Sequence, residues 1–127
     1  MTTFSKSNKE ITLIYNSDDH IGQKILAYAH SENIPVRDIN LKFMKLTATH
    51  WAQLATMMNV KIRDFVNTEH PNFSQKFGKS DQLSSEDWLK LLINNPEILR
   101  APVVIKGDKV SMMTNPQEML GFVNQII

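Results

Sequence analysis

The first half of the chain combines two short apolar runs with one amphipathic segment. Residues 11–15 (ITLIY) are apolar, β-branched or aromatic throughout, which is typical of a strand covered on both faces. A polar cluster at 16–19 is followed by apolar residues at every fourth position over about 19–31, the spacing of one helix face. A second, less apolar strand is predicted at 36–39. This order predicts two parallel strands joined by a right-handed helical crossover.

The middle of the chain has helical spacing, and the end returns to strands. Thr47 and Ser84 each precede apolar positions three and four residues apart, so each is expected to cap a helix. Two β-branched runs around Gly107-Asp108 predict a hairpin. Asn115-Pro116 then predicts the start of a last helix, with the proline at its first position.

This pattern predicts one domain. Residues 1–9 are polar and are expected to form a flexible N-terminal tail, while 10–127 form the domain, with a helical insert at about 45–96. The tail lacks the apolar core of a secretion signal, and no stretch approaches the roughly 18 apolar residues of a membrane span. A cytoplasmic location and no membrane partner are therefore expected.

Composition excludes several classes of chemistry. The 127 residues carry 14 Lys plus Arg against 13 Asp plus Glu, and this net charge of +1 argues against direct nucleic-acid binding. Cysteine is absent, so the chain has no disulfide, no thiolate metal ligand and no cysteine nucleophile. The four histidines lack the spacing of a helical metal site. We therefore expect neither a metal nor a cofactor.

Four stretches resemble the arsenate reductase and Spx family. They are 11–17 (ITLIYNS), 83–89 (LSSEDWL), 95–105 (NPEILRAPVVI) and the Asn-Pro pair at 115–116. The resemblance extends over about 10–126. It implies an α/β, thioredoxin-like fold, in which a β-α-β half and a β-β-α half form the core and the helical insert lies between them.

The residues that this family uses for chemistry are replaced here. The resemblance places the family's cysteine, at the start of the first helix, at His20, and the second cysteine of regulatory members at Gln23. Family reductases hold the oxyanion with arginines, and two of those positions correspond to Ala101 and Asn115, while Arg63 corresponds to a third. The resemblance therefore implies a pseudoenzyme that has no catalytic residues.

The surroundings of His20 predict a remnant binding groove. Asp18 and Asp19 would repel an anion at the helix start, and both suit that position as helix caps. Thioredoxin-like folds place a cis-proline opposite this helix, and Pro102 resembles it. The predicted groove comprises Asp18, Asp19, His20, Arg63, Arg100, Ala101 and Pro102. It is expected to favour a peptide over a phosphate; the alternative is that the proline only shapes the entry of the third strand.

Three functional hypotheses follow, in order of preference. The first is a protein-binding or regulatory module; Spx-type relatives contact RNA polymerase, which implies a partner in the transcription machinery. The second is a thiol-free enzyme that uses glutathione, with Ser17, Tyr15 or His20 activating the thiol. The third is a structural domain that retains no site.

Overall fold

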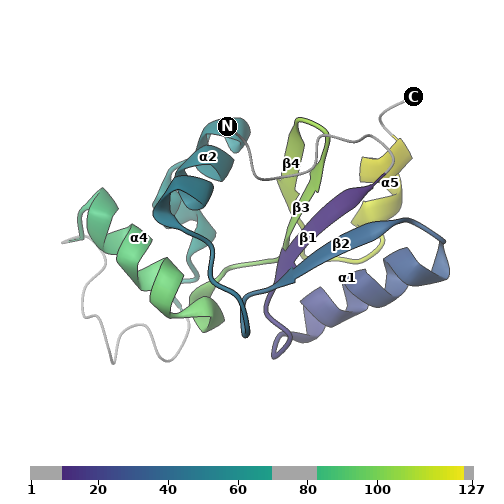
Figure 1. Ribbon diagram of the computed structural model, residues 1–127, viewed down its shortest axis with the longest axis horizontal. Coiled ribbons are helices and arrows are strands. Elements are labelled where there is room, and N and C mark those ends of the chain that lie inside the picture. The colour runs from purple at the N-terminus through teal and green to yellow at the C-terminus, as the bar shows by residue number, and fades with distance from the viewer. Residues whose placement is uncertain (1–9, 70–82, 125–127) are drawn as a thin grey trace. The chain divides into compact units, whose positions relative to one another are not determined.

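The computed structural model describes residues 10–69 and 83–124 (Figure 1). The predicted tail at 1–9 lies outside these residues. Along the chain the elements are β1 (Ile11–Tyr15), α1 (His20–Ser31), β2 (Val36–Asn40), α2 (Ala48–Met58), η1 (Ile62–Phe65), α4 (Ser85–Asn94), η3 (Pro96–Ile98), β3 (Val103–Lys106), β4 (Lys109–Met112) and α5 (Glu118–Asn124). They fall into two compact units: an α/β unit, Met1–Met44 with Ala101–Ile127, and a helical unit, Lys45–Arg100.

The four strands form one mixed sheet in the order β2-β1-β3-β4. β1 runs parallel to β2, with Ile14 opposite Ile39, and antiparallel to β3, with Ile14 opposite Val103. The parallel pair needs the α1 crossover, whereas β3 and β4 are joined by a two-residue turn in which Gly107 has a φ of 62°. These are the pairings predicted from the sequence, and they are confirmed.

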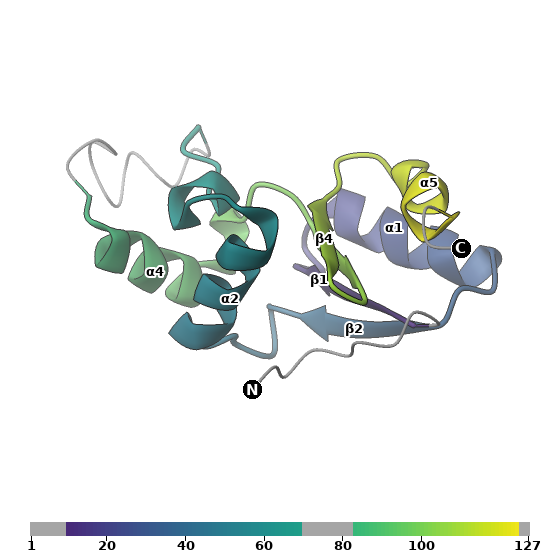
Figure 2. The same ribbon diagram turned by 90° about the horizontal axis from the view of Figure 1, so that it is seen from above.

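Helices α1 and α5 cover the same side of the sheet (Figure 2). The core on that side combines alternate β1 residues with both helices: Ile11, Leu13, Tyr15, Ile25, Ala29, Val104, Met113, Met119 and Phe122. At Gly22, α1 comes so near β1 that a Cβ atom would lie 2.9 Å from the Cβ of Tyr15. This close approach fixes where α1 begins relative to the end of β1.

The last helix begins later than predicted. α5 starts at Glu118, whereas the sequence predicts a start at Pro116. The Glu118 carboxylate accepts hydrogen bonds from the backbone N–H groups of Thr114 and Asn115, at 3.3 and 3.0 Å. The Asn115 side chain accepts a further bond from the Gln117 N–H at 2.9 Å. These contacts hold residues 115–117 in a turn ahead of the helix.

The helical unit packs around aromatic rings. Trp51 of α2 meets Phe65 of η1 with ring centroids 5.3 Å apart, and Trp88 of α4 is 3% exposed. Both tryptophans of the chain lie in this unit, and both tyrosines, Tyr15 and Tyr28, lie in the α/β unit.

Each main helix of this unit begins with a cap that spans one turn. The Thr47 hydroxyl accepts from the His50 N–H at 3.2 Å, and the Ser84 hydroxyl accepts from the Asp87 N–H at 3.2 Å. The backbone N–H of Ser84, and then its hydroxyl, lower the pKa of the Asp87 carboxyl. Both predicted caps are confirmed.

Candidate functional site

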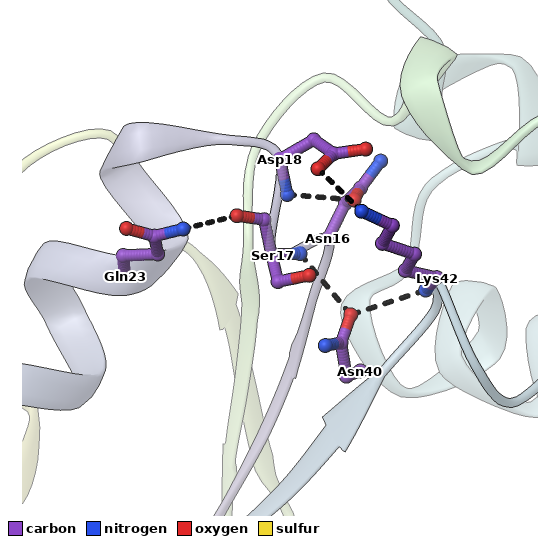
Figure 3. A network of polar contacts seen from close by, with 6 residues as sticks. All are labelled: Asn16, Ser17, Asp18, Gln23, Asn40 and Lys42. Atoms are coloured by element: carbon purple, nitrogen blue, oxygen red, sulfur yellow. Dashed lines mark hydrogen bonds and ion pairs between the residues drawn. The ribbon is translucent and has the colours of Figure 1, made fainter.

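The loop that leaves β1, residues 16–19, occupies the position where the family resemblance places the reactive site. It is joined to the end of β2 through Asn40 (Figure 3). The Asn40 Oδ1 accepts hydrogen bonds from the backbone N–H groups of Ser17 and Lys42, each at 3.1 Å. One side chain therefore fixes the loop after β1 and the turn after β2 at once.

The loop also bonds to itself. Asn16 is 8% exposed, and its Oδ1 accepts from the Asp18 N–H at 3.0 Å while its carbonyl accepts from the Asp19 N–H at 2.8 Å. The Gln23 amide donates from α1 to the carbonyl of Ser17. Asn16 thus forms an Asx turn, in which its side-chain oxygen takes the place of a backbone carbonyl as acceptor.

The two acidic residues of the loop have different roles. Asp19 is the N-cap of α1, and its carboxylate accepts from the Ile21 N–H at 3.1 Å, as predicted. Asp18 does not cap the helix, because its Oδ1 lies 3.0 Å from the Lys42 Nζ. The side chains of this pair are 67% and 47% exposed, so water screens the attraction and the pair contributes little stability.

These contacts determine what the loop can bind. A helix start and its preceding loop bind oxyanions when their N–H groups point outward without an acceptor. Here the N–H groups of Ser17, Asp18, Asp19 and Ile21 each have an acceptor within the chain. An anion would have to displace these acceptors and approach two carboxylates. The arrangement therefore opposes anion binding at this loop.

Five of the seven predicted groove residues lie at one end of the sheet. His20 is exposed at the start of α1, beside Asp18 and Asp19 in sequence. Because β1 and β3 are antiparallel with Ile14 opposite Val103, residues 101–102 precede β3 at the end where β1 finishes. Ala101 and Pro102 are buried there.

The other two groove residues, Arg63 and Arg100, belong to the helical unit. The Arg63 guanidinium lies 5.8 Å from the ring centroid of Trp88, a cation–π contact. The backbone N–H of Arg100 donates to the Phe65 carbonyl at 2.7 Å. Arg63 also lines an open surface pocket of about 610 Å³ that only residues of this unit form: Asn59, Val60, Lys61, Arg63 and Asp64. The groove as a whole stays a prediction.

The expectation of a cis-proline is wrong, because the described residues contain no cis peptide bond and the bond before Pro102 is trans. The trans form of an X–Pro bond is intrinsically favoured by about 0.5–1 kcal/mol, so a cis bond needs surroundings that select it. Here the Pro102 carbonyl accepts from the Met113 N–H at 2.9 Å, and Ala101 is 3% exposed. The chain therefore enters β3 through a trans bond, with Ala101 buried and the Pro102 carbonyl bonded to Met113.

Tyr15 ends β1 with its hydroxyl group already engaged. The hydroxyl donates to the Asp38 Oδ2 of β2 at 3.1 Å. Burial of the ring, followed by this hydrogen bond and by the negative charge of Asp38, raises the pKa of Tyr15. A residue that activates a thiol must donate a hydrogen bond to the developing thiolate. The Tyr15 hydroxyl already donates its hydrogen to Asp38.

Within residues 10–69 and 83–124, no three His, Asp or Glu side chains gather as a metal ion would require. Among the helices of that same part of the chain, none reaches the length and apolarity of a transmembrane span.

Solved structures similar to this chain share its fold. A Vibrio cholerae arsenate reductase is 15% identical, with 89% of this chain and 97% of that chain covered and a TM-score of 0.76. A Yersinia pestis protein is also 15% identical, over 87% and 98%, with a TM-score of 0.78. An arsenate reductase (ArsC) related protein from Brucella melitensis is 14% identical, over 89% and 93%, with a TM-score of 0.67. The fold is thus the thioredoxin-like fold of arsenate reductases, as predicted.

The ArsC family matches residues 4–122, so the chain belongs to the ArsC family. It is a member without cysteine. No curated protein matches the sequence.

Sequence reasoning missed Asn40 and Lys42, which hold the loop after β1. A signal for them exists, because the carboxyl ends of adjacent parallel strands lie at the same edge of a sheet. Residues that follow the second predicted strand must therefore lie beside those that follow the first. Asn40 and Lys42 stand at that position in the sequence.

Proposed function

We propose that this protein is a non-catalytic member of the ArsC family that acts by binding a protein partner and carries out no thiol redox chemistry. The observation that carries this proposal is the state of the loop after β1. His20 stands where the family resemblance places the thiolate, and the neighbouring N–H groups are bonded within the chain. The nucleophile is absent, and the N–H groups of Ser17, Asp18, Asp19 and Ile21 are already used within the chain, which supports a function without thiol chemistry.

The glutathione-using alternative is not supported at Tyr15, one of its three candidate residues. The Tyr15 hydroxyl donates to Asp38, and its raised pKa is unfavourable for stabilising a thiolate. The backbone N–H of Ser17 is bonded to Asn40 and its carbonyl to Gln23. These contacts use the loop for its own stability.

The class of partner follows from the family resemblance. Spx-type relatives act on transcription by contacting RNA polymerase, and such a contact does not itself require a thiol. We therefore propose a protein of the transcription machinery as the partner. This part of the proposal rests on the resemblance alone and is tested separately from the loss of catalysis.

The loss of catalysis is tested by assaying arsenate reduction with glutathione and glutaredoxin. The unmodified protein is expected to give the background rate, because the first chemical step needs a thiolate. His20→Cys is expected to recover little activity, since the loop N–H groups remain bonded to Asn16, Asn40 and Asp19. The Vibrio cholerae arsenate reductase serves as the positive control.

Arsenate turnover by the unmodified protein, with contaminating reductases excluded, would contradict the proposal. The partner class is tested by titrating the immobilised protein with purified RNA polymerase from the same organism. Saturable binding is expected. If polymerase does not bind at micromolar concentration, the transcription partner is rejected while the non-catalytic assignment stands.

A further inference from the structure

The turn after β2 exposes two large apolar side chains. Phe43 is 80% exposed and Met44 is 56% exposed, and they are the exposed large hydrophobic residues in the described part of the chain. Single exposed apolar residues are ordinary on protein surfaces, but an exposed phenylalanine next to an exposed methionine is not. Both residue types are enriched at the centres of protein interfaces.

The backbone of this turn is held in place by several hydrogen bonds. The Asn40 carbonyl accepts from the N–H groups of Phe43 and Met44, at 3.1 and 3.0 Å, and the Leu41 N–H donates to the Tyr15 carbonyl at 2.7 Å. The Asn40 side chain holds the Lys42 N–H as well. Phe43 is thus displayed from an ordered backbone. Binding through it would therefore require ordering of the side chain but not of the backbone, which favours an efficient anchor.

The charges around the pair are mainly positive. Lys42 has its Nζ 5.8 Å from the Phe43 ring centroid, and Lys45, the next residue after Met44, is exposed. Asp18 neutralises one of these two charges through its contact with Lys42. The Lys45 Nζ lies 3.3 Å from the Asn94 Oδ1, an uncharged partner, and among residues 10–69 and 83–124 no carboxylate forms an ion pair with it. A complementary surface would place carboxylates around an apolar pocket.

We propose that Phe43 and Met44 form a docking anchor that inserts into an apolar pocket bordered by carboxylates on the protein partner. This inference rests on the proposed protein-binding function and specifies the surface that carries it. The anchor lies in the turn after β2 and does not include His20, so binding would not require any chemistry at His20.

The experiment places a photo-crosslinking phenylalanine analogue at position 43, and in a matched control at position 27, where Ala27 is exposed on α1. Crosslinking is carried out in cells, and the protein captured from position 43 is purified. It is then titrated with wild-type protein, Phe43→Ser/Met44→Ser and Ala27→Ser. The double variant is expected to bind about tenfold more weakly or worse, the loss typical of an interface anchor. Ala27→Ser is expected to bind as the wild type does.

The outcomes separate this inference from the proposed function. Equal capture from positions 43 and 27, or an unchanged Kd for the double variant, would overturn the anchor. If purified RNA polymerase still binds in that case, the proposed function survives. Self-association that is lost in the double variant would make a second copy of this chain the occupant and would also overturn the proposed partner. Thermal unfolding of the double variant should match the wild type, since both side chains are exposed.

Discussion

The helix caps of the helical unit each span one helical turn, whereas Asn40 at the end of the α/β sheet joins distant parts of the sequence. Ser84 and Asp87 are three residues apart and fix the start of one helix. Asn40 lies 23 residues from Ser17 and fixes a loop and a turn on two different strands. A local cap can be lost with little effect elsewhere, but the loss of Asn40 affects two loops.

The largest expected effect is that of Asn40→Ala. It leaves the N–H groups of Ser17 and Lys42 without their acceptor, and the loss of two such bonds is expected to lower the free energy of unfolding by about 2 kcal/mol. Urea denaturation measures this change. Asn40→Asp, which keeps an acceptor oxygen, is the matched control and should lose much less. If amide exchange in Asn40→Ala accelerated in only one of the two loops, the claim that Asn40 holds both loops would be contradicted.

A smaller and more local effect is expected for Ser84→Ala. Removing this cap hydroxyl is expected to cost about 1 kcal/mol, because the Asp87 N–H loses its acceptor. Amide exchange should accelerate in α4 and leave the loop at 16–19 unchanged. Ser84→Thr retains the hydroxyl and should behave nearly as the wild type. Accelerated exchange at Ser17 in the alanine variant would show that the cap is not local.

The smallest effect is confined to alkaline solution. The pKa of Tyr15 in the folded protein is raised above its usual value of 10.0, so the unfolded chain releases this proton at lower pH than the folded one. The free energy of unfolding is therefore expected to fall as the pH rises above 10. Tyr15→Phe should remove this part of the slope. Identical slopes for the two proteins between neutral and alkaline pH would contradict the role of the Asp38 contact.

The elements of the fold were largely predictable because their signals are local. Asp19, Thr47 and Ser84 cap helices a few residues away, and the period of apolar positions marks each buried face. The start of α5 was placed two residues too early, because the Glu118 and Met119 N–H groups bond to the carbonyls of Asn115 and Pro116, three residues back, and make a turn ahead of the helix.

The site was less predictable because its contacts are not local. Asp18 had the sequence of a cap but pairs with Lys42, 24 residues away. The trans bond before Pro102 depends on packing and on the bond from Met113, and no neighbouring residue in the sequence indicates these contacts. The anchor at Phe43 and Met44 was also invisible, because an isolated apolar pair has the same pattern whether it is buried or exposed.

The separation of aromatic residues between the two units has a practical consequence. Tryptophan fluorescence, excited at the red edge of absorption where tyrosine is silent, reports only on the helical unit through Trp51 and Trp88. The tyrosine part of the absorbance, after subtraction of the tryptophan contribution, reports only on the α/β unit through Tyr15 and Tyr28. The unmodified protein thus carries two separate optical probes, one for each unit. Coincident denaturation curves from the two probes would establish that the units unfold as a single cooperative system.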